Sequence, residues 1–154
     1  MATEIERKYL LKNDGWRAGA EGVLYRQGYL STAAERNVRV RTIGERAYLT
    51  VKGKGEGITR LEFEYEIPLA DGEAMLDRLC HRPLIEKVRY KIEHGGLVWE
   101  VDEFRGDNAG LVVAEVELES EDQVFAAPPW VGEEVTADPR YLNANLVRRP
   151  YTTW

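Results

Sequence analysis

The chain has 154 residues, a single cysteine and a formal net charge of −6. We expect one domain over residues 1–154, which is long enough to bury a core without structural metals. The lone cysteine excludes an intramolecular disulfide and favours a cytoplasmic location. The acidic charge argues against a nucleic-acid surface, and no segment approaches the ~20 apolar residues of a membrane span, so neither nucleic acid nor membrane is an expected partner.

The first part of the sequence alternates apolar and polar side chains, which predicts strands with one apolar face. Residues 3–11 place Glu4, Glu6 and Lys8 on one face, with Ile5 and Tyr9 on the other. We predict further strands at residues 23–31, 37–43, 47–53 and 60–68.

The pattern changes after residue 70. Met75, Leu76 and Leu79 recur at helical spacing, which predicts a short helix over residues 71–80. Alternation returns in three segments, residues 85–94, 97–104 and 111–120, and a last helix is expected from Tyr141 to about Val147. Seven or eight amphipathic strands in hairpin order predict an antiparallel barrel or sandwich, with helices covering its apolar outer faces.

The polar faces of these strands are charged, and most rows carry one sign. The basic rows are Arg39 and Arg41, Lys52 and Lys54, and Lys87, Arg89 and Lys91. The acidic rows are Glu62, Glu64 and Glu66, Glu100 and Asp102, and Glu115, Glu117 and Glu119. Because like charges repel on a sheet face, the rows indicate a site for metal cations and a polyanion. Alternatively, each row is the solvated side of an ordinary sheet, paired at the surface for ~0–1 kcal/mol per pair.

The two signs suit different parts of one ligand. Mg²⁺ and Mn²⁺ prefer carboxylate and phosphate oxygens, so Glu4 and Glu6, with Glu115 or Glu117, could hold one or two ions. Arginine binds phosphate bidentately and lysine binds it as a point charge. Several basic strands around one cavity would suit a chain of phosphates, and without a Walker loop the site must be built from side chains.

The order of these motifs resembles the CYTH, or triphosphate tunnel metalloenzyme, family. Its N-terminal Glu-x-Glu-x-Lys signature is matched by Glu4, Glu6 and Lys8. Later matches are Arg39, Arg41, Lys52, Glu62, Glu64, Lys87, Arg89, Asp102, Glu115, Glu117 and the closing segment 138–143. Over essentially the whole chain, the resemblance implies an α+β fold: an eight-stranded antiparallel β-barrel, the triphosphate tunnel, with a few helices packed outside.

The resemblance also implies an activity, the metal-dependent hydrolysis of inorganic triphosphate to pyrophosphate and phosphate with Mg²⁺ or Mn²⁺. The implied metal ligands are Glu4, Glu6, Glu62, Glu64, Asp102, Glu115 and Glu117. The implied phosphate-binding residues are Lys8, Arg39, Arg41, Lys52, Lys87, Arg89 and Arg140. Lys8 and Lys87 are also the implied catalytic residues; Lys8 could orient the attacking water, assist proton transfer or pair with Glu4 or Glu6.

Three other functions fit the same charged rows. A class IV adenylyl cyclase would use them on ATP, and a thiamine triphosphatase would add an aromatic platform at one mouth. A polyphosphate-binding module would bind without catalysis. Tyr29 is expected to pack or to line the pocket, and Arg140 to close a tunnel end or cap the last helix. A monomer or a homodimer is expected.

Overall fold

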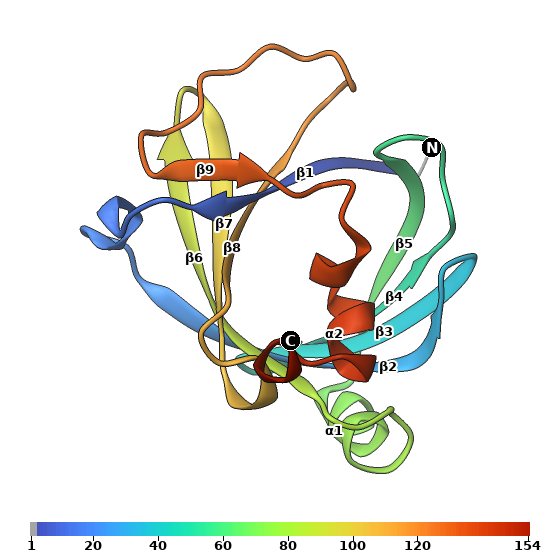
Figure 1. The fold of residues 1–154 in the computed structure, drawn as a ribbon. Helices are drawn as coiled ribbons and strands as arrows, with labels where there is room; N and C mark the ends of the chain where they lie inside the picture. The colour runs from blue at the N-terminus through green and yellow to red at the C-terminus, as the bar shows by residue number, and fades with distance from the viewer. Residues whose placement is uncertain (1–2) are drawn as a thin grey trace.

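Eight antiparallel strands close into a hydrogen-bonded ring in the computed structural model of the chain, which describes residues 3–154 (Figure 1). The strands are β1 (Thr3–Leu11), β2 (Gly22–Ala33), β3 (Arg36–Ile43), β4 (Arg46–Lys52), β5 (Thr59–Ile67), β6 (Ile85–His94), β7 (Leu97–Phe104) and β8 (Val112–Glu117). Around the ring they follow the order β1-β5-β4-β3-β2-β6-β7-β8 and return to β1. The predicted eight-stranded antiparallel architecture is confirmed.

β1 closes the ring, because its two ends pair with different strands. Glu4 lies opposite Arg60 of β5, whereas Glu6 and Lys8 lie opposite Glu117 and Glu115 of β8. The N-terminal run of charged residues therefore spans the seam between the two ends of the sheet.

One short strand is absent from the sequence prediction. β9 (Val131–Glu134) pairs with the end of β1, beyond the part of β1 that pairs with β5. It has four residues and follows Pro128-Pro129, so it is too short to show alternation.

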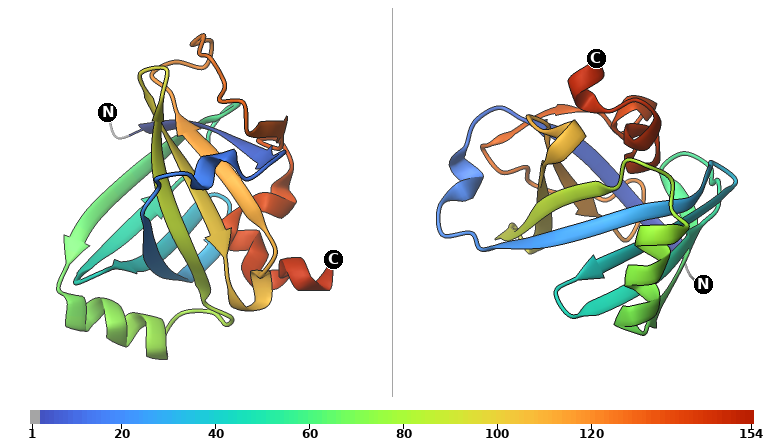
Figure 2. Two further views of the ribbon diagram at one scale, coloured as in Figure 1. Left: turned by 90° about the vertical axis from the view of Figure 1, so that its left-hand side faces the viewer. Right: turned by 90° about the horizontal axis from the view of Figure 1, so that it is seen from below.

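The two helices occupy different places in the fold. α1 (Leu69–Arg78) covers the outside of the ring over β3 and β4. It approaches closely at Gly72, where a Cβ atom would stand 2.6 Å from the Cβ of Ala47. α2 (Asn143–Arg148) lies at one end of the ring against β2 and β6 (Figures 1 and 2). Within the described residues, no helix is long and apolar enough to cross a membrane.

The buried apolar side chains form two clusters, one on the outer face of the ring and one at an end of its interior. Trp99, Val101 and Val116 on β7 and β8 are fully buried together with Trp16 and Trp130 from the connecting segments. A second cluster joins strand residues to the C-terminal segment and contains Tyr29, Ile85, Phe104, Leu111, Val113, Val135, Tyr141, Leu146 and Val147. Burial of these clusters contributes about 25 cal/mol per Å² of apolar surface. The second cluster closes one end of the interior, and the charged rows line the cavity beyond it.

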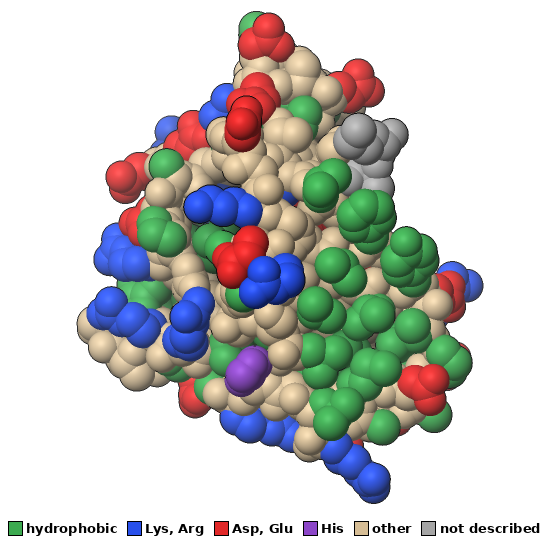
Figure 3. Space-filling view, turned by 90° about the vertical axis from the view of Figure 1, so that its right-hand side faces the viewer, with side chains coloured by type: hydrophobic (Ala, Val, Ile, Leu, Met, Phe, Trp, Pro, Cys, Tyr) green, Lys and Arg blue, Asp and Glu red, His purple; other side chains and the backbone are tan. Residues whose placement is uncertain are grey.

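The outer face of β5 stays open. Leu61, Phe63 and Tyr65 are exposed along it, and hydrophobic side chains gather on this side of the molecule (Figure 3).

Candidate active site

The charged rows line a cavity of about 570 Å³ inside the ring. Its wall includes these sequence-predicted site residues: Glu4, Glu6, Lys8, Arg39, Arg41, Lys52, Glu62, Glu64, Lys87, Arg89, Glu115 and Glu117. They come from β1, β3, β4, β5, β6 and β8. The rows therefore enclose a shared space, which the solvated-sheet alternative does not provide. The outermost members of three rows, Glu66, Lys91 and Glu119, are exposed and lie beyond this wall.

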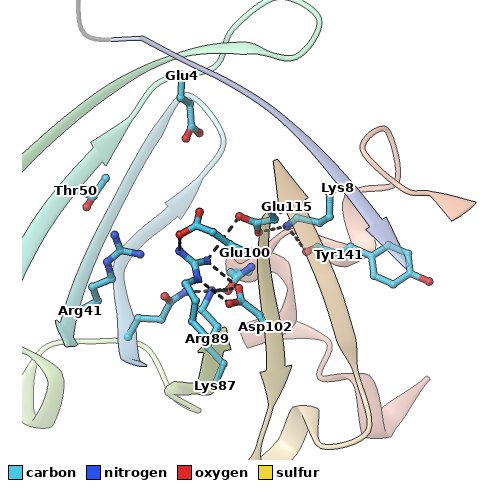
Figure 4. A network of polar contacts seen from close by, with 12 residues as sticks. Glu4, Lys8, Arg41, Thr50, Lys87, Arg89, Glu100, Asp102, Glu115 and Tyr141 are labelled. Atoms are coloured by element: carbon cyan, nitrogen blue, oxygen red, sulfur yellow. Dashed lines mark hydrogen bonds and ion pairs between the residues drawn. The ribbon is translucent and has the colours of Figure 1, made fainter. Parts of the chain in front are cut away.

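Asp102 holds two cations at the base of the cavity (Figure 4). Its carboxylate accepts hydrogen bonds from Nε and Nη2 of Arg89 at 2.7 and 2.9 Å, and it lies 2.8 Å from Nζ of Lys87. Arg89 and Asp102 face each other directly across β6 and β7, which places the bidentate pair. Asp102 is fully buried and Lys87 is 1 % exposed, so the pair is shielded from solvent.

Burial and pairing have opposite effects on these three groups. Burial favours the neutral form of Asp102, but the charges of Arg89 and Lys87 outweigh it and hold the pKa of that carboxyl below its ordinary value. Burial lowers the pKa of Lys87 to about 8, even though Asp102 favours its charged form. The pKa of Arg89 is raised well above its ordinary value, because Asp102 outweighs burial there. Arg89 is therefore a fixed cation.

Lys8 is held between a strand and the C-terminal segment. Its Nζ donates a hydrogen bond to the carbonyl of Tyr141 at 2.9 Å and lies 3.4 Å from Oε1 of Glu115 (Figure 4). Glu115 is also 3.7 Å from Nη2 of Arg89. Burial favours the protonated form of Glu115, but Lys8, Arg89 and Lys87 outweigh it, so its pKa lies well below the ordinary value. Lys8 thus has the acidic partner Glu115, rather than the expected Glu4 or Glu6.

The opposite wall, formed by β3, β4 and β5, carries interleaved ion pairs. Lys52 lies 2.9 Å from Oε1 of Glu4 and 3.4 Å from Oε2 of Glu62. Glu64 accepts a hydrogen bond from Thr50 at 2.8 Å, and its Oε2 lies 3.3 Å from Arg41. A further basic side chain, Arg39, lies 3.8 Å from the same oxygen.

The acids of this wall differ in proton affinity. Burial would raise the pKa of Glu4, but Lys52 and Arg60, whose Nη2 is 3.1 Å away, hold it at about 2. Burial and the neighbouring Glu4 carboxyl instead raise the pKa of Glu62 to about 6. Burial lowers the pKa of Arg41, and the charges of Arg39 and Arg89 lower it further. The wall therefore concentrates positive charge that a polyanion would compensate.

Glu6 and Glu117 are the two predicted metal ligands that form no ion pair within residues 3–154. They stand directly opposite each other on β1 and β8. Burial, followed by the charges of Glu115 and Glu4, raises the pKa of Glu6 to about 8. Burial and the charges of Glu4 and Glu100 also raise the pKa of Glu117. Ionising these two carboxyls therefore has a cost, set by burial and by the neighbouring acids, that a bound cation would offset.

The donor set fits a hard divalent cation that shares its shell with a ligand. Within the part of the chain that the structure describes, no three carboxylate, histidine or cysteine side chains converge tightly enough to hold a metal ion by themselves. Mg²⁺ is usually bound by one or two carboxylates together with phosphate oxygens and water, rather than by an all-protein cage. Glu6 and Glu117 supply two uncompensated carboxylates of this kind beside the basic wall.

Two predicted site residues lie outside the cavity wall. Asp102 is behind it and contacts Lys87 and Arg89, so the structure places it as a partner of cations. Arg140 pairs with Asp138 at 2.8 Å, and its guanidinium lies 4.9 Å from the ring centre of Trp154. Arg140 thus lies near the end of the ring that the C-terminal segment covers, which fits the expected role of closing a tunnel end.

Sequence reasoning missed several residues of the cavity. Glu100 lines it and lies 3.1 Å from Arg89; its place in the acidic row was the available signal. Asn143, also on the wall, contacts Lys87, and behind it lies Gln27, which is fully buried. Neutral amides give no charge pattern, so neither was predicted as a site residue. The available signal for Asn143 was its place in the closing segment 138–143, which resembles that of the CYTH family. Tyr29 lines the pocket as expected.

Known proteins are similar to this chain in sequence and fold over nearly its whole length. The CYTH domain family matches residues 2–151. An inorganic triphosphatase of Acetivibrio thermocellus is 54% identical over 98% of this chain and 97% of its own length. An inorganic triphosphatase of Nitrosomonas europaea is 42% identical over 94% and 96%. A crystal structure of an inorganic triphosphatase superposes with a TM-score of 0.66 at 38% identity, covering 96% of this chain and 95% of the other.

Proposed function

The chain belongs to the CYTH domain family, and from that premise we propose that it is an inorganic triphosphatase, which hydrolyses tripolyphosphate to pyrophosphate and phosphate. Two relatives of that name support the assignment. We place the activity in a single domain of residues 1–154, in the cytoplasm, acting as a monomer or a homodimer with a small-molecule triphosphate as its partner.

One observation carries the proposal: a set of basic side chains and two acidic side chains without an ion-pair partner among the described residues line the same cavity. Arg39, Arg41 and Lys52 form a basic surface on β3 and β4. Glu6 and Glu117 form an acidic surface across β1 and β8 that has no basic partner among the described residues. A chain of phosphates that carries a divalent cation would satisfy both surfaces at once.

The wall favours an inorganic substrate over a nucleoside or thiamine triphosphate. The aromatic side chains on the described part of the wall are Tyr29 and Tyr141, and both are largely buried, at 3 % and 8 % exposure. Both belong to the cluster packed beneath the C-terminal segment. A base or a thiamine ring would need an exposed aromatic face or a dedicated apolar pocket, which this wall does not offer.

A divalent cation is part of the proposed reaction, with Mg²⁺ or Mn²⁺ as the chemically suited ions. Glu6 and Glu117 would hold it, with substrate oxygens completing its shell. When bound, it would reduce the negative charge of the phosphate chain and lower the pKa of a coordinated water. Glu4, Glu62 and Glu64, already engaged by basic side chains, would tune the charge of the opposite wall.

The protein's own residues supply binding and charge stabilisation. Arg39, Arg41 and Lys52 would hold the phosphate chain, while Lys87 and Arg89, fixed by Asp102, would stabilise the charge that shifts as the terminal phosphoryl group is transferred. Lys8, held by Glu115 and the Tyr141 carbonyl, would donate to the terminal phosphate or orient the attacking water. Fixed cations of this kind require little rearrangement during the reaction.

The reaction products test the proposal. We expect ³¹P NMR of tripolyphosphate incubated with the protein and Mg²⁺ or Mn²⁺ to show equal amounts of pyrophosphate and phosphate. EDTA should stop the reaction, and added cation should restore it. Binding of tripolyphosphate without turnover in either cation would instead favour a polyphosphate-binding module.

A further inference from the structure

The side-chain amide of Asn143 stands between two side-chain donors from neighbouring strands. Its Oδ1 accepts a hydrogen bond from Nζ of Lys87 at 3.0 Å and another from Nε2 of Gln27, also at 3.0 Å. Lys87 is on β6 and Gln27 on β2, two strands that pair with each other. Asn143 itself is the first residue of α2 and the last of the closing segment 138–143.

The orientation of this amide follows from the chemistry of its neighbours. A lysine ammonium can only donate, so the oxygen of Asn143, and not its nitrogen, must face Lys87. Gln27 then has to present its NH₂ group to the same oxygen. As a result, Oε1 of Gln27 is buried and has no hydrogen-bond partner within residues 3–154. A buried acceptor without a partner is unfavourable, and the contact with Asn143 requires this orientation of Gln27.

The contact with Asn143 restricts the ammonium of Lys87. Its three N–H groups point in tetrahedral directions. One is directed to Asp102, at 2.8 Å, and one to Asn143. A third remains for a ligand in the cavity that Lys87 lines. With a single acceptor, the ammonium could turn about its bond to Asp102; with two, the direction of the third N–H is fixed.

We propose that Asn143 is a positioning residue, which aims the free N–H of Lys87 at the phosphate chain and is itself held by Gln27. The inference deepens the proposed function and rests on it, because it concerns the same cavity. It also gives the C-terminal segment a role in the reaction, because Asn143 on α2 is the second hydrogen-bond acceptor of Lys87 on β6.

A double-mutant cycle tests the proposal. Asn143→Ala should lower kcat for tripolyphosphate by on the order of 10- to 100-fold, the range in which misplaced catalytic groups fall. In a Lys87→Met background the same substitution should cause almost no further loss, since its target is gone. Equal losses with and without Lys87 would overturn the inference. An inactive wild-type protein would instead refute the proposed function.

Two further variants separate positioning from folding. Gln27→Met removes the donor behind Asn143 without altering the cavity wall, and it also removes the unpaired carbonyl. We expect a smaller fall in kcat that again vanishes without Lys87, with little change in melting temperature. Asn145→Ala is the matched control on α2, because Asn145 also lines the cavity. The substitution breaks a hydrogen bond to the carbonyl of Pro139 and one from Arg148, but none to a lysine, so its effect should be the same in both backgrounds.

A crystal structure of Asn143→Ala provides a readout that does not depend on activity. We expect Nζ of Lys87 to leave its present position or to become disordered while Asp102 stays in place. A lysine that keeps the wild-type position in this variant would contradict the positioning role.

Discussion

Glu6 and Glu117 face each other directly across β1 and β8, and neither has a basic side chain within ion-pair distance among residues 3–154. Other acids of the same wall are paired: Glu115 with Lys8, and Glu4 with Lys52. Like charges placed directly opposite each other destabilise a sheet. Burial and the charges of Glu115 and Glu4 also raise the pKa of Glu6 to about 8. Keeping both carboxyls ionised therefore costs free energy, and we infer that a bound cation offsets this cost.

The first prediction concerns this pair. Glu6→Gln/Glu117→Gln keeps the shape of both side chains and removes both titrating carboxyl groups, so the protein should fold at least as stably as the wild type. Metal-dependent turnover should fall by on the order of 100-fold or more, since even outer-shell changes cost about 10- to 100-fold at metal sites. Phosphate release measured across a Mg²⁺ titration would show it. Undiminished turnover at low Mg²⁺ would remove these two residues from the metal site.

The second prediction is a pH dependence of the metal-free protein. The pKa of Glu6 is about 8 in the folded state, against an ordinary value of 4.5. Between these two values the folded state binds more protons than the unfolded chain, so the unfolding free energy falls as pH rises through this window. In EDTA, the melting temperature should therefore decrease from pH 6 to about pH 8.

Glu6→Gln is the control for that measurement. The variant has no titrating group at this position, so its melting temperature should fall less steeply over the same pH range. An equal slope in the two proteins would mean that another group causes the decrease.

The third prediction concerns Asp102 and the cations it contacts. Asp102→Asn removes the counter-charge of the buried Lys87 and one of the three acids around Arg89, and losing one partner of a buried ion pair costs about 3–5 kcal/mol. Urea unfolding should show this loss, together with loss of activity. Glu66→Gln provides the contrast, because the 3.6 Å pair of Glu66 with Arg46 is solvent-exposed and is worth ~0–1 kcal/mol. Equal costs for the two variants would contradict the structural role of Asp102.

Much of the fold could be predicted because alternation has a direct physical cause. β1, β6 and β7 begin and end where their charged and apolar residues alternate. The helical spacing of Met75, Leu76 and Leu79 likewise indicates α1. The helix begins at Leu69, two residues before the predicted start. Period-two spacing assigns residues to a face, and this was enough to bring most of the charged rows together in one cavity.

Residue spacing alone could not predict which charged side chains line the cavity and which lie behind it, nor the contacts of uncharged side chains. Asp102 and Glu100 share one face of β7, yet Glu100 lines the cavity and Asp102 lies behind it, because the pairing of β6 with β7 places Arg89 over Asp102. The contact of Asn143 with Lys87 depends on where α2 packs, a tertiary relationship that the closing segment 138–143 does not reveal by itself. Arg140 was expected among the phosphate ligands, but Asp138 and Trp154 engage it outside the described wall.

The fourth prediction is that ligand stabilises the fold. Binding to the native state alone raises the unfolding free energy by ~2.7 kcal/mol at a hundredfold excess over Kd. Tripolyphosphate should raise the melting temperature, and more strongly with Mg²⁺ present. Arg39→Ala/Arg41→Ala should lose most of the rise, since these guanidinium groups form the basic wall. A melting temperature that does not change across the titration would argue against a phosphate site in the cavity.

The most direct test of the central claim compares two substrates under the same conditions. Tripolyphosphate needs only the charged wall and a placed water, whereas a cyclase must also hold the nucleoside with its ribose hydroxyl in line with the α-phosphate. We predict that kcat/KM for tripolyphosphate far exceeds that for ATP, and that chromatography of the ATP reaction yields ADP or AMP. Cyclic AMP as the main product, or ATP as the better substrate, would contradict the account.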